Sequence, residues 1–185
     1  MDFEYIKQMN EGLDRNALLD ELMMTYGKDV WNYAYFLTKH RELAEDIAQD
    51  TFVKAYHNLY TFRGSSSMKA WLLAIARNTS KDYYKSSWFR RVRLIEPDDA
   101  VGPSIPSAEN EWFCSEYRRE VWHAVLGLPR KLRETLLLQA HYRLSLKEIA
   151  DLMQLSEGTV KSRLFRARTA VNRKLGKSQP SEGSL

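Results

Sequence analysis

Apolar residues recur at three- and four-residue spacing along most of the chain, and no convincing two-residue alternation is present. Such spacing places apolar side chains on one side of a helix, whereas a half-exposed strand would alternate at every second residue. The pattern therefore predicts an all-α protein. Helices are expected at about 14–25, 28–39, 41–59 and 68–90, with a second helical block from about 111 to 175.

The stretch IEPDDAVGPSIPSAEN interrupts this helical pattern. It contains three of the five prolines, no Lys or Arg, and no periodicity, which is typical of a linker. The last residues, GKSQPSEGSL, are polar and are expected to be disordered. We therefore expect two small helical domains joined by a flexible linker. The predicted bounds are 1–93 for the first domain, 94–111 for the linker, 112–176 for the second domain and 177–185 for the tail.

The second helical block contains two helices with recognisable first residues. Ser145 followed by Glu148 forms a capping box, so a helix is expected to begin at about Leu146. Ser156 is expected to cap a second helix after a tight turn. Two helices around a tight turn predict a helix-turn-helix, whose second helix lies in the major groove of duplex DNA. Gln154 stands in the turn where such proteins often have glycine, so it is expected to adopt an unusual backbone angle at a cost of about 1 kcal/mol.

The second of these helices is amphipathic. Its apolar residues fall within one narrow sector, and they are Val160, Leu164, Ala167, Val171 and Leu175. Its outward side and flanks carry polar and basic residues that can bond to base edges or phosphates, and these are Thr159, Lys161, Ser162, Arg163, Arg166, Thr169 and Arg173. Phe165 is expected on the exposed side, where it would touch a thymine methyl group or pack at the domain edge. The alternative for the whole stretch is a helical hairpin with a solvated basic side.

The segment ELAEDIAQDTFVKAYHNLYTF predicts a strongly amphipathic helix in the first domain. One side is apolar, and the other presents Glu45, Asp46, Gln49, Asp50 and Val53. The acidic side would repel DNA phosphates, so it favours a basic or polar protein partner. The alternative is a plain solvated helix surface.

The next segment, SMKAWLLAIARNTSKDYYKSSWFRRVR, mixes cations with aromatic residues. Trp71 falls on the apolar side and is expected mostly in the core, while Asn78, Lys81 and Tyr84 fall on the other side. Cations beside aromatic rings suit single-stranded DNA, because charges follow the backbone and rings stack on bases. The preceding loop, FRGSSSMK, is small and polar and could hold an extruded base, or it is merely a connector between helices.

Charge is unevenly distributed along the chain. The formal net charge is +4, but residues 53–93 carry nine cations and one acid, residues 94–111 carry five acids and no cation, and residues 141–185 carry nine cations and four acids. Two basic blocks separated by an acidic one suggest two surfaces for a polyanion, although ordinary solvated surface is the alternative.

The remaining composition narrows the class of protein. Cys114 is the only cysteine, so no intrachain disulfide can form. The first residues do not form a signal peptide, and no apolar run approaches the roughly 18 residues of a membrane span, so a cytoplasmic location is expected. The four histidines lack ligand spacing and no glycine-rich phosphate loop occurs, so we expect no metal and no cofactor. Asp82 stands alone among the cations, which disfavours an enzyme acting on nucleic acid.

Together these motifs resemble the sigma-70 family of RNA polymerase sigma factors, in its extracytoplasmic-function (ECF) subgroup. AEDIAQDTFVKAY looks like region 2.2 of that family, and FRGSSSMKAWLLAIARNTSKDYYK looks like regions 2.3 and 2.4. LPRKLRETLLL and LSLKEIADLMQLSEGTVKSRLFRARTAV look like region 4. The resemblance covers about residues 14–175.

The resemblance implies a role for each motif, in a protein that is not an enzyme. Region 2.2 would bind the clamp helices of the polymerase β′ subunit through Asp46, Gln49, Asp50 and Phe52, with packing as the competing role of Phe52. Region 4 would dock on the β-subunit flap and bind the −35 element through Thr159, Lys161, Ser162, Arg163, Phe165 and Arg166. Regions 2.3 and 2.4 would open and read the −10 element through Arg63, Ser65, Ser66, Lys69, Asn78, Lys81, Tyr84 and Lys85. An anti-sigma factor is an expected partner, because members of the subgroup are typically held inactive by one.

Two other classes of protein remain compatible with the sequence. A helix-turn-helix regulator would bind duplex DNA without polymerase, although the acidic helix followed by a basic aromatic one argues against it. An adaptor would keep the fold without reading promoters.

Overall fold

In the computed structural model of the protein, residues 15–85 and 116–178 are described, and all regular elements within these ranges are helical. The prediction of an all-α protein is confirmed for this part of the chain. The chain divides into two units, Met1–Ser104 and Ile105–Leu185, and each is described by itself. The predicted linker at 94–111 lies outside the described residues. None of the described helices combines the length and apolar character needed to cross a membrane.

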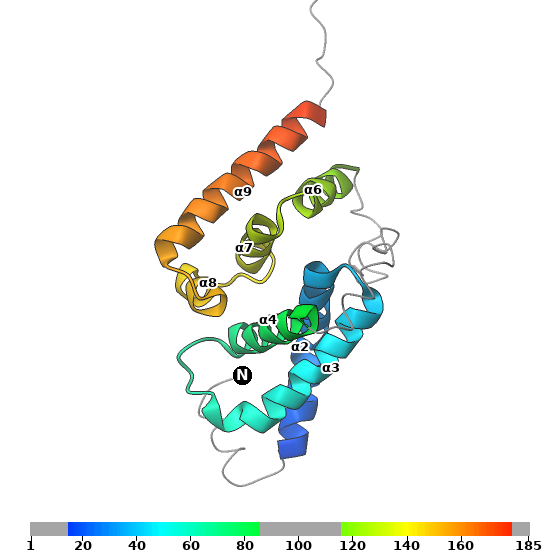
Figure 1. Cartoon of the computed structure of the whole chain (residues 1–185), viewed down its shortest axis with the longest axis vertical. Coiled ribbons are helices and arrows are strands. Elements are labelled where there is room, and N and C mark those ends of the chain that lie inside the picture. The colour runs from blue at the N-terminus through cyan, green and yellow to red at the C-terminus, as the bar shows by residue number, and fades with distance from the viewer. Residues whose placement is uncertain (1–14, 86–115, 179–185) are drawn as a thin grey trace, which may run out of the picture. The chain divides into compact units, whose positions relative to one another are not determined.

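The first unit is built on three long helices (Figure 1). Its described elements are α2 (Arg15–Thr38), α3 (Arg41–Asn58), the 3-10 turn η1 (Leu59–Thr61) and α4 (Met68–Lys85). The separate helices predicted at 14–25 and 28–39 are wrong, because α2 runs through both. The predicted break fell beside Gly27, but a glycine inside a helix costs only about 1 kcal/mol relative to alanine. Burial of Leu22 and Val30 on either side of it, each 1% exposed, outweighs that cost.

One side of α3 forms the centre of this unit. Leu43, Ile47 and Ala55 are at most 1% exposed, and the buried Thr51 hydroxyl donates to the Ile47 carbonyl at 2.6 Å. Both α2 and α4 pack on α3, and Figure 1 shows α4 crossing the pair formed by α2 and α3. Burying a side chain of leucine or isoleucine size contributes about 1.5–3 kcal/mol. This burial fixes the rotation of α3, so its opposite side must face solvent.

The loop between η1 and α4 is held at both ends. The Phe62 and Trp71 rings lie with their centroids 5.6 Å apart, and Trp71 is half-buried. Gly64 has a φ of 67°, a left-handed conformation that glycine adopts without steric cost. The Ser67 hydroxyl caps α4 by accepting a hydrogen bond from the Ala70 N–H at 3.3 Å. The small polar residues between these points are therefore presented at a fixed place beside α4.

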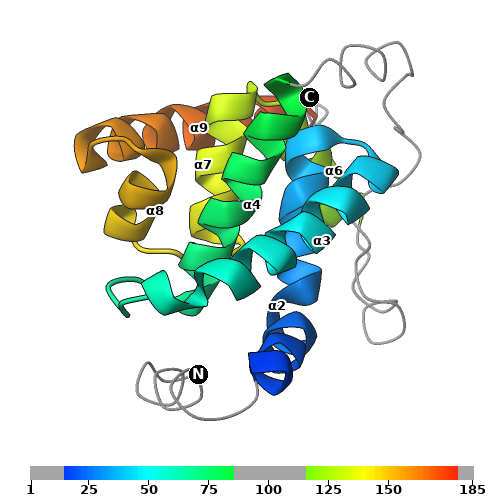
Figure 2. The same ribbon diagram turned by 60° about the horizontal axis from the view of Figure 1, so that its bottom comes forward.

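The described part of the second unit comprises α6 (Glu116–Leu126), α7 (Arg130–Ala140), α8 (Leu146–Met153) and α9 (Glu157–Ser178). Helix α9 packs against each of the other three, and Figures 1 and 2 show α8 meeting α9 at a sharp turn. Because α9 extends to Ser178, the tail predicted at 177–185 begins two residues too early. Residues 179–185 lie outside the described part of the chain.

The predicted first residues of α8 and α9 are confirmed. The Ser145 hydroxyl accepts from the Glu148 N–H at 3.2 Å, and the Glu148 carboxylate accepts from the Ser145 N–H at 2.9 Å, which is a complete capping box. Ser156 accepts from the Thr159 N–H at 3.2 Å. Between the helices, Gln154 adopts the left-handed conformation that the turn was expected to require, with φ 58° and ψ 54°.

The apolar side predicted for α9 is also confirmed. Val160, Leu164, Ala167 and Val171 are all buried, and Leu175 is half-buried. On α8, the same core receives Ile149, Leu152 and Met153. Lys161, Arg166 and Arg173 are consequently exposed, whereas Arg168 and Lys174 donate to Gln139 and to the Gly127 carbonyl in the rest of the unit.

We predict that Gln154→Gly stabilises the second unit by about 0.5–1 kcal/mol, because glycine removes the steric strain of the left-handed conformation. Gln154 is exposed, so the change removes no buried contact. Hydrogen exchange of the core amides of α9 should slow roughly two- to five-fold. Gln154→Ala keeps a Cβ and is the matched control; an equal slowing in that variant would show that strain at this turn is not the cause.

Candidate functional site

The outward side of α3 presents the acidic surface that the sequence predicted. Asp46 and Gln49 are exposed, Asp50 is half-buried, and Val53 is 54% exposed. We call Asp46, Gln49, Asp50 and Val53 the α3 surface. It combines two carboxylates, an amide and an apolar patch on consecutive turns of one rigid helix, which suits a basic protein partner rather than DNA.

Asp50 is joined to α4. The Tyr83 hydroxyl donates to Asp50 Oδ2 at 3.0 Å across 33 residues of sequence. The pKa of Tyr83 is raised to about 12, first because burial disfavours the phenolate, then because of the hydrogen bond to Asp50 and the negative charges of Asp50 and Asp46. No pattern in the sequence indicated this contact, because it joins two helices through residues 33 positions apart.

Phe52 does not lie on the α3 surface. It is 5% exposed and belongs to the packed core of the unit. Of the two roles that the sequence allowed for Phe52, packing is the one that its burial supports. An aromatic ring at this depth has no area left for a partner protein to cover.

Five of the residues predicted at the −10 element surround the loop and the outward side of α4. Arg63, Ser65, Asn78 and Lys85 are exposed, and Ser66 is half-buried. These side chains offer charge and hydrogen-bonding groups along the loop and α4. The described part of this surface thus has cations and small polar groups that suit a nucleic-acid strand, while the half-buried Trp71 ring lies against Phe62.

Lys81, Lys69 and Tyr84 are already engaged within the protein. Lys81 Nζ donates to Asn78 Oδ1 at 3.4 Å, so these two predicted residues lie together. Lys69 Nζ forms an ion pair with Asp29 Oδ2 on α2 at 2.7 Å.

The Tyr84 hydroxyl donates to the Leu37 carbonyl at 2.7 Å, and its ring packs on the core cluster that contains Tyr35 and Ile47. The contacts of Lys69 and Tyr84 tie α4 to α2, which is a structural role. A direct role for these two residues at the −10 element remains a prediction.

The outward side of α9 gathers the residues predicted for the −35 element. Lys161, Ser162 and Arg166 are exposed, and Phe165 is 72% exposed. Arg166 is held along the helix, since its Nη2 donates to Ser162 Oγ at 3.3 Å.

Thr159 and Arg163 are half-buried at the edges of this side. Thr159 is hydrogen-bonded to the Ser156 cap, Oγ1 to Oγ, at 2.9 Å. The six residues therefore lie on the first three turns of α9, which is the part of such a helix that enters a major groove.

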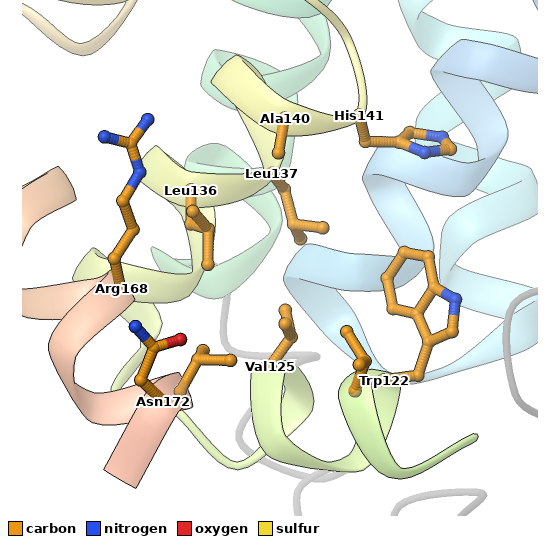
Figure 3. Close-up of a pocket in the computed structure, with 10 residues that line it drawn as sticks. Trp122, Val125, Leu136, Leu137, Ala140, His141, Arg168 and Asn172 are labelled. Carbon is orange, nitrogen blue, oxygen red and sulfur yellow. The ribbon is translucent and has the colours of Figure 1, made fainter. Parts of the chain in front are cut away.

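A pocket in the second unit was not foreseen from the sequence. It has a volume of about 310 Å³ and lies between α6, α7 and α9. Figure 3 shows Val125, Leu136 and Leu137 pointing into it, with Arg168 on one side and Trp122 on the other. No pattern in the sequence indicates where three helices leave a gap.

The described residues contain no group of His, Cys, Asp or Glu that could hold a metal ion.

Comparison with known proteins identifies the family to which these two units belong. The chain matches the family description "Sigma-70 region 2" over residues 22–90 and "Sigma-70, region 4" over residues 118–171. It is 32% identical to the RNA polymerase sigma-H factor of Pseudomonas aeruginosa over 183 residues, covering 94% of this chain and 93% of that protein. It is 36% identical to the ECF RNA polymerase sigma-E factor of Haemophilus influenzae over 138 residues, covering 70% and 73%.

A solved structure supports the same fold. The sigma factor RpoE of Bartonella quintana, crystallised in complex with the anti-sigma factor NepR, is 26% identical and superposes with a TM-score of 0.63, over 86% of this chain and 98% of that one. The α2–α4 unit corresponds to sigma region 2, and the α6–α9 unit corresponds to sigma region 4. The chain belongs to the sigma-70 family of RNA polymerase sigma factors, in the ECF group.

We predict that alkaline pH destabilises the first unit partly through Tyr83. Because its pKa is raised to about 12 in the folded protein from about 10 in the unfolded chain, its contribution to stability is complete below about pH 10. That contribution is lost as the pH rises towards about 12. The free energy of unfolding, measured by urea denaturation from pH 9 to 11.5, should fall less steeply in Tyr83→Phe than in the unmodified protein. Parallel curves for the two proteins would contradict the prediction.

Proposed function

We propose that this chain binds core RNA polymerase, directs it to promoters with a −35 and a −10 element, and assists in opening the duplex. The observation that carries the proposal is α9, a capped helix whose apolar side is buried while Lys161, Ser162 and Arg166 are exposed, in a chain of the sigma-70 family. In this role the chain performs no chemistry, because the polymerase forms the phosphodiester bonds. The chain would then act in the bacterial cytoplasm, where the polymerase and the chromosome are.

The α3 surface is the proposed contact with the clamp helices of the polymerase β′ subunit. Its carboxylates suit a basic partner, and its exposed Val53 offers apolar area beside them. We leave Phe52 out of this contact because it is buried. As a buried residue of α3, Phe52 helps to anchor the helix that carries the α3 surface.

The loop after η1 and the outward side of α4 are the proposed site for the non-template strand of the −10 element. Arg63 and Lys85 supply charge for the backbone, while Ser65, Ser66 and Asn78 supply hydrogen bonds for base edges. Lys81 lies within reach of Asn78 and would position its amide. The left-handed backbone at Gly64 and the helix cap formed by Ser67 give the loop a defined shape. This supports the proposed role, since a loop that is already ordered loses little entropy when a base enters.

The apolar pocket of the second unit is the proposed dock for the β-subunit flap. Val125, Leu136 and Leu137 give it an apolar floor, and Ala140 at its edge is exposed. An apolar side chain of the flap would fill space that water occupies poorly. Arg168 and Asn172 at the α9 side offer polar contacts around the apolar centre (Figure 3).

We also infer that an anti-sigma factor regulates the chain. RpoE of Bartonella quintana, whose fold this chain shares at 26% identity, was solved in complex with the anti-sigma factor NepR. A partner that covers the α3 surface or the flap pocket would compete directly with polymerase.

Gel filtration of the purified chain with bacterial core RNA polymerase tests the central proposal. Co-elution at near-equal stoichiometry is expected, together with specific run-off transcription from genomic DNA. A folded chain, free of inhibitor, that did not co-elute but bound duplex DNA tightly by itself would instead be an independent regulator.

We predict that Asp46→Arg lowers the affinity for core polymerase at least ten-fold, because it places a cation against a basic partner. Asp46 is exposed, so the fold should not change. Binding of labelled chain to core polymerase, followed by fluorescence anisotropy, measures the loss. Asp20→Arg, at an exposed position on α2, changes the net charge equally and is the matched control. Equal losses in both variants would point to a non-specific charge effect.

We predict that Arg166→Ala weakens recognition of the −35 element by about 1–3 kcal/mol, as expected for loss of a bidentate base contact. Competition between promoter variants in run-off transcription, with the bases of the −35 element changed one at a time, measures this specificity. Arg173→Ala, two turns further along the same side of α9, is the control for loss of one cation. A uniform loss on all sequences would make Arg166 a phosphate contact instead.

A further inference from the structure

The contact between Tyr83 and Asp50 joins a helix assigned to DNA with a surface assigned to polymerase. The hydroxyl lies 3.0 Å from Asp50 Oδ2, which is a hydrogen bond to a charged acceptor. Asp50 is half-buried, so its carboxylate is confined by its surroundings and yet reachable from outside. This combination singles out Asp50 among the acids of the α3 surface.

The Tyr83 ring is itself held in place. It packs against the buried cluster of the first unit, whose members include Ala34, Leu43 and Ile47. A second contact between the same two helices lies one turn along α3, where Lys54 Nζ is 3.1 Å from Thr79 Oγ1. Because the ring and the two helices cannot move independently, the hydroxyl is a fixed donor rather than a mobile one.

The donor is also electrically neutral, and this matters for binding. Elsewhere on α3, Glu45 is paired with Arg41 at 3.2 Å, and Lys54 lies 3.6 Å from Asp82. Among the described residues, no cation pairs with Asp50. A tyrosine hydroxyl can therefore fix the direction of this carboxylate without cancelling its charge.

A carboxylate has about four acceptor positions, and the Tyr83 hydroxyl takes one of them. The others remain for a basic side chain of a partner. An aspartate without such a contact would sample several rotamers and lose that freedom on binding, at a cost that lowers affinity. The hydrogen bond removes part of this cost before the partner arrives.

We propose that Tyr83 is a positioning residue for polymerase binding, which acts by holding the Asp50 carboxylate in the orientation that the polymerase recognises. The proposal rests on the proposed function of the α3 surface. Tyr83 does not itself touch the polymerase in this arrangement, and its whole effect passes through Asp50.

The test compares variants in their affinity for bacterial core RNA polymerase, with no DNA present. Tyr83→Phe keeps the ring and removes only the hydroxyl, so we expect a roughly three- to ten-fold loss of affinity. Thr38→Val is the control for stability, because it removes a buried hydroxyl that donates to the Ala34 carbonyl at 2.9 Å and bonds to His40 between α2 and α3, and Thr38 is not part of the α3 surface. We expect Thr38→Val to lower the melting temperature and leave the affinity unchanged.

A double-mutant cycle shows whether the effect passes through Asp50. Asp50→Ala, which removes the acceptor as well as the charge, should alone weaken binding, and adding Tyr83→Phe to it should weaken binding no further. Additive losses would overturn the proposal, because Tyr83 would then act without Asp50. Equal losses in Tyr83→Phe and Thr38→Val would also overturn it, by showing that only stability had changed.

The remaining outcomes distinguish the positioning role of Tyr83 from the proposed binding of polymerase by the α3 surface. If Asp50→Ala weakens binding and Tyr83→Phe does not, the positioning role of Tyr83 is wrong and the proposed role of the α3 surface stands. If neither variant weakens binding, Asp50 has no part in the docking of polymerase, and both proposals fail at this residue.

Discussion

Burial of one side of α3 is the constraint on which the first unit depends. Leu43, Ile47 and Ala55 are almost completely covered by α2 and α4, and no other rotation of α3 would bury them. The free energy of that burial, about 1.5–3 kcal/mol for each large side chain, decides which side of the helix is left outside. The acidic α3 surface is therefore a consequence of packing, and its carboxylates are displayed on a support that does not move.

In the second unit, burial of the apolar side of α9 likewise determines which of its residues are exposed. Two caps and the left-handed turn at Gln154 fix where α8 stops and α9 starts, and the apolar side of α9 fixes its rotation. Lys161, Ser162 and Arg166 are then directed outward, and Arg166 is held along the helix by its hydrogen bond to Ser162. A chain of sigma-70 type needs this arrangement, because a groove-reading helix must present its polar side as a rigid unit.

Polar contacts between the helices of the first unit fix the positions of α3 and α4 relative to each other and of α4 relative to α2. Tyr83 to Asp50 and Lys54 to Thr79 connect α3 with α4, while Tyr84 connects α4 with the end of α2. Such contacts add modestly to stability, on the order of 1 kcal/mol each. Their larger effect is on geometry, since the surface assigned to polymerase and the surface assigned to single-stranded DNA share one set of packed helices.

The amino-acid sequence by itself determined the helical class, the two caps, the strained residue of the turn and the buried side of α9, because each depends on the order of neighbouring residues along one helix. It did not determine that α2 continues past Gly27, that Phe52 is buried, or that Lys69 and Tyr84 bind residues of α2. Those outcomes depend on which helices meet, as do the pocket between α6, α7 and α9 and the pairing of Tyr83 with Asp50 across 33 residues. Only the tertiary structure decides them, because periodicity specifies the side of a helix that is buried but not the partner that buries it.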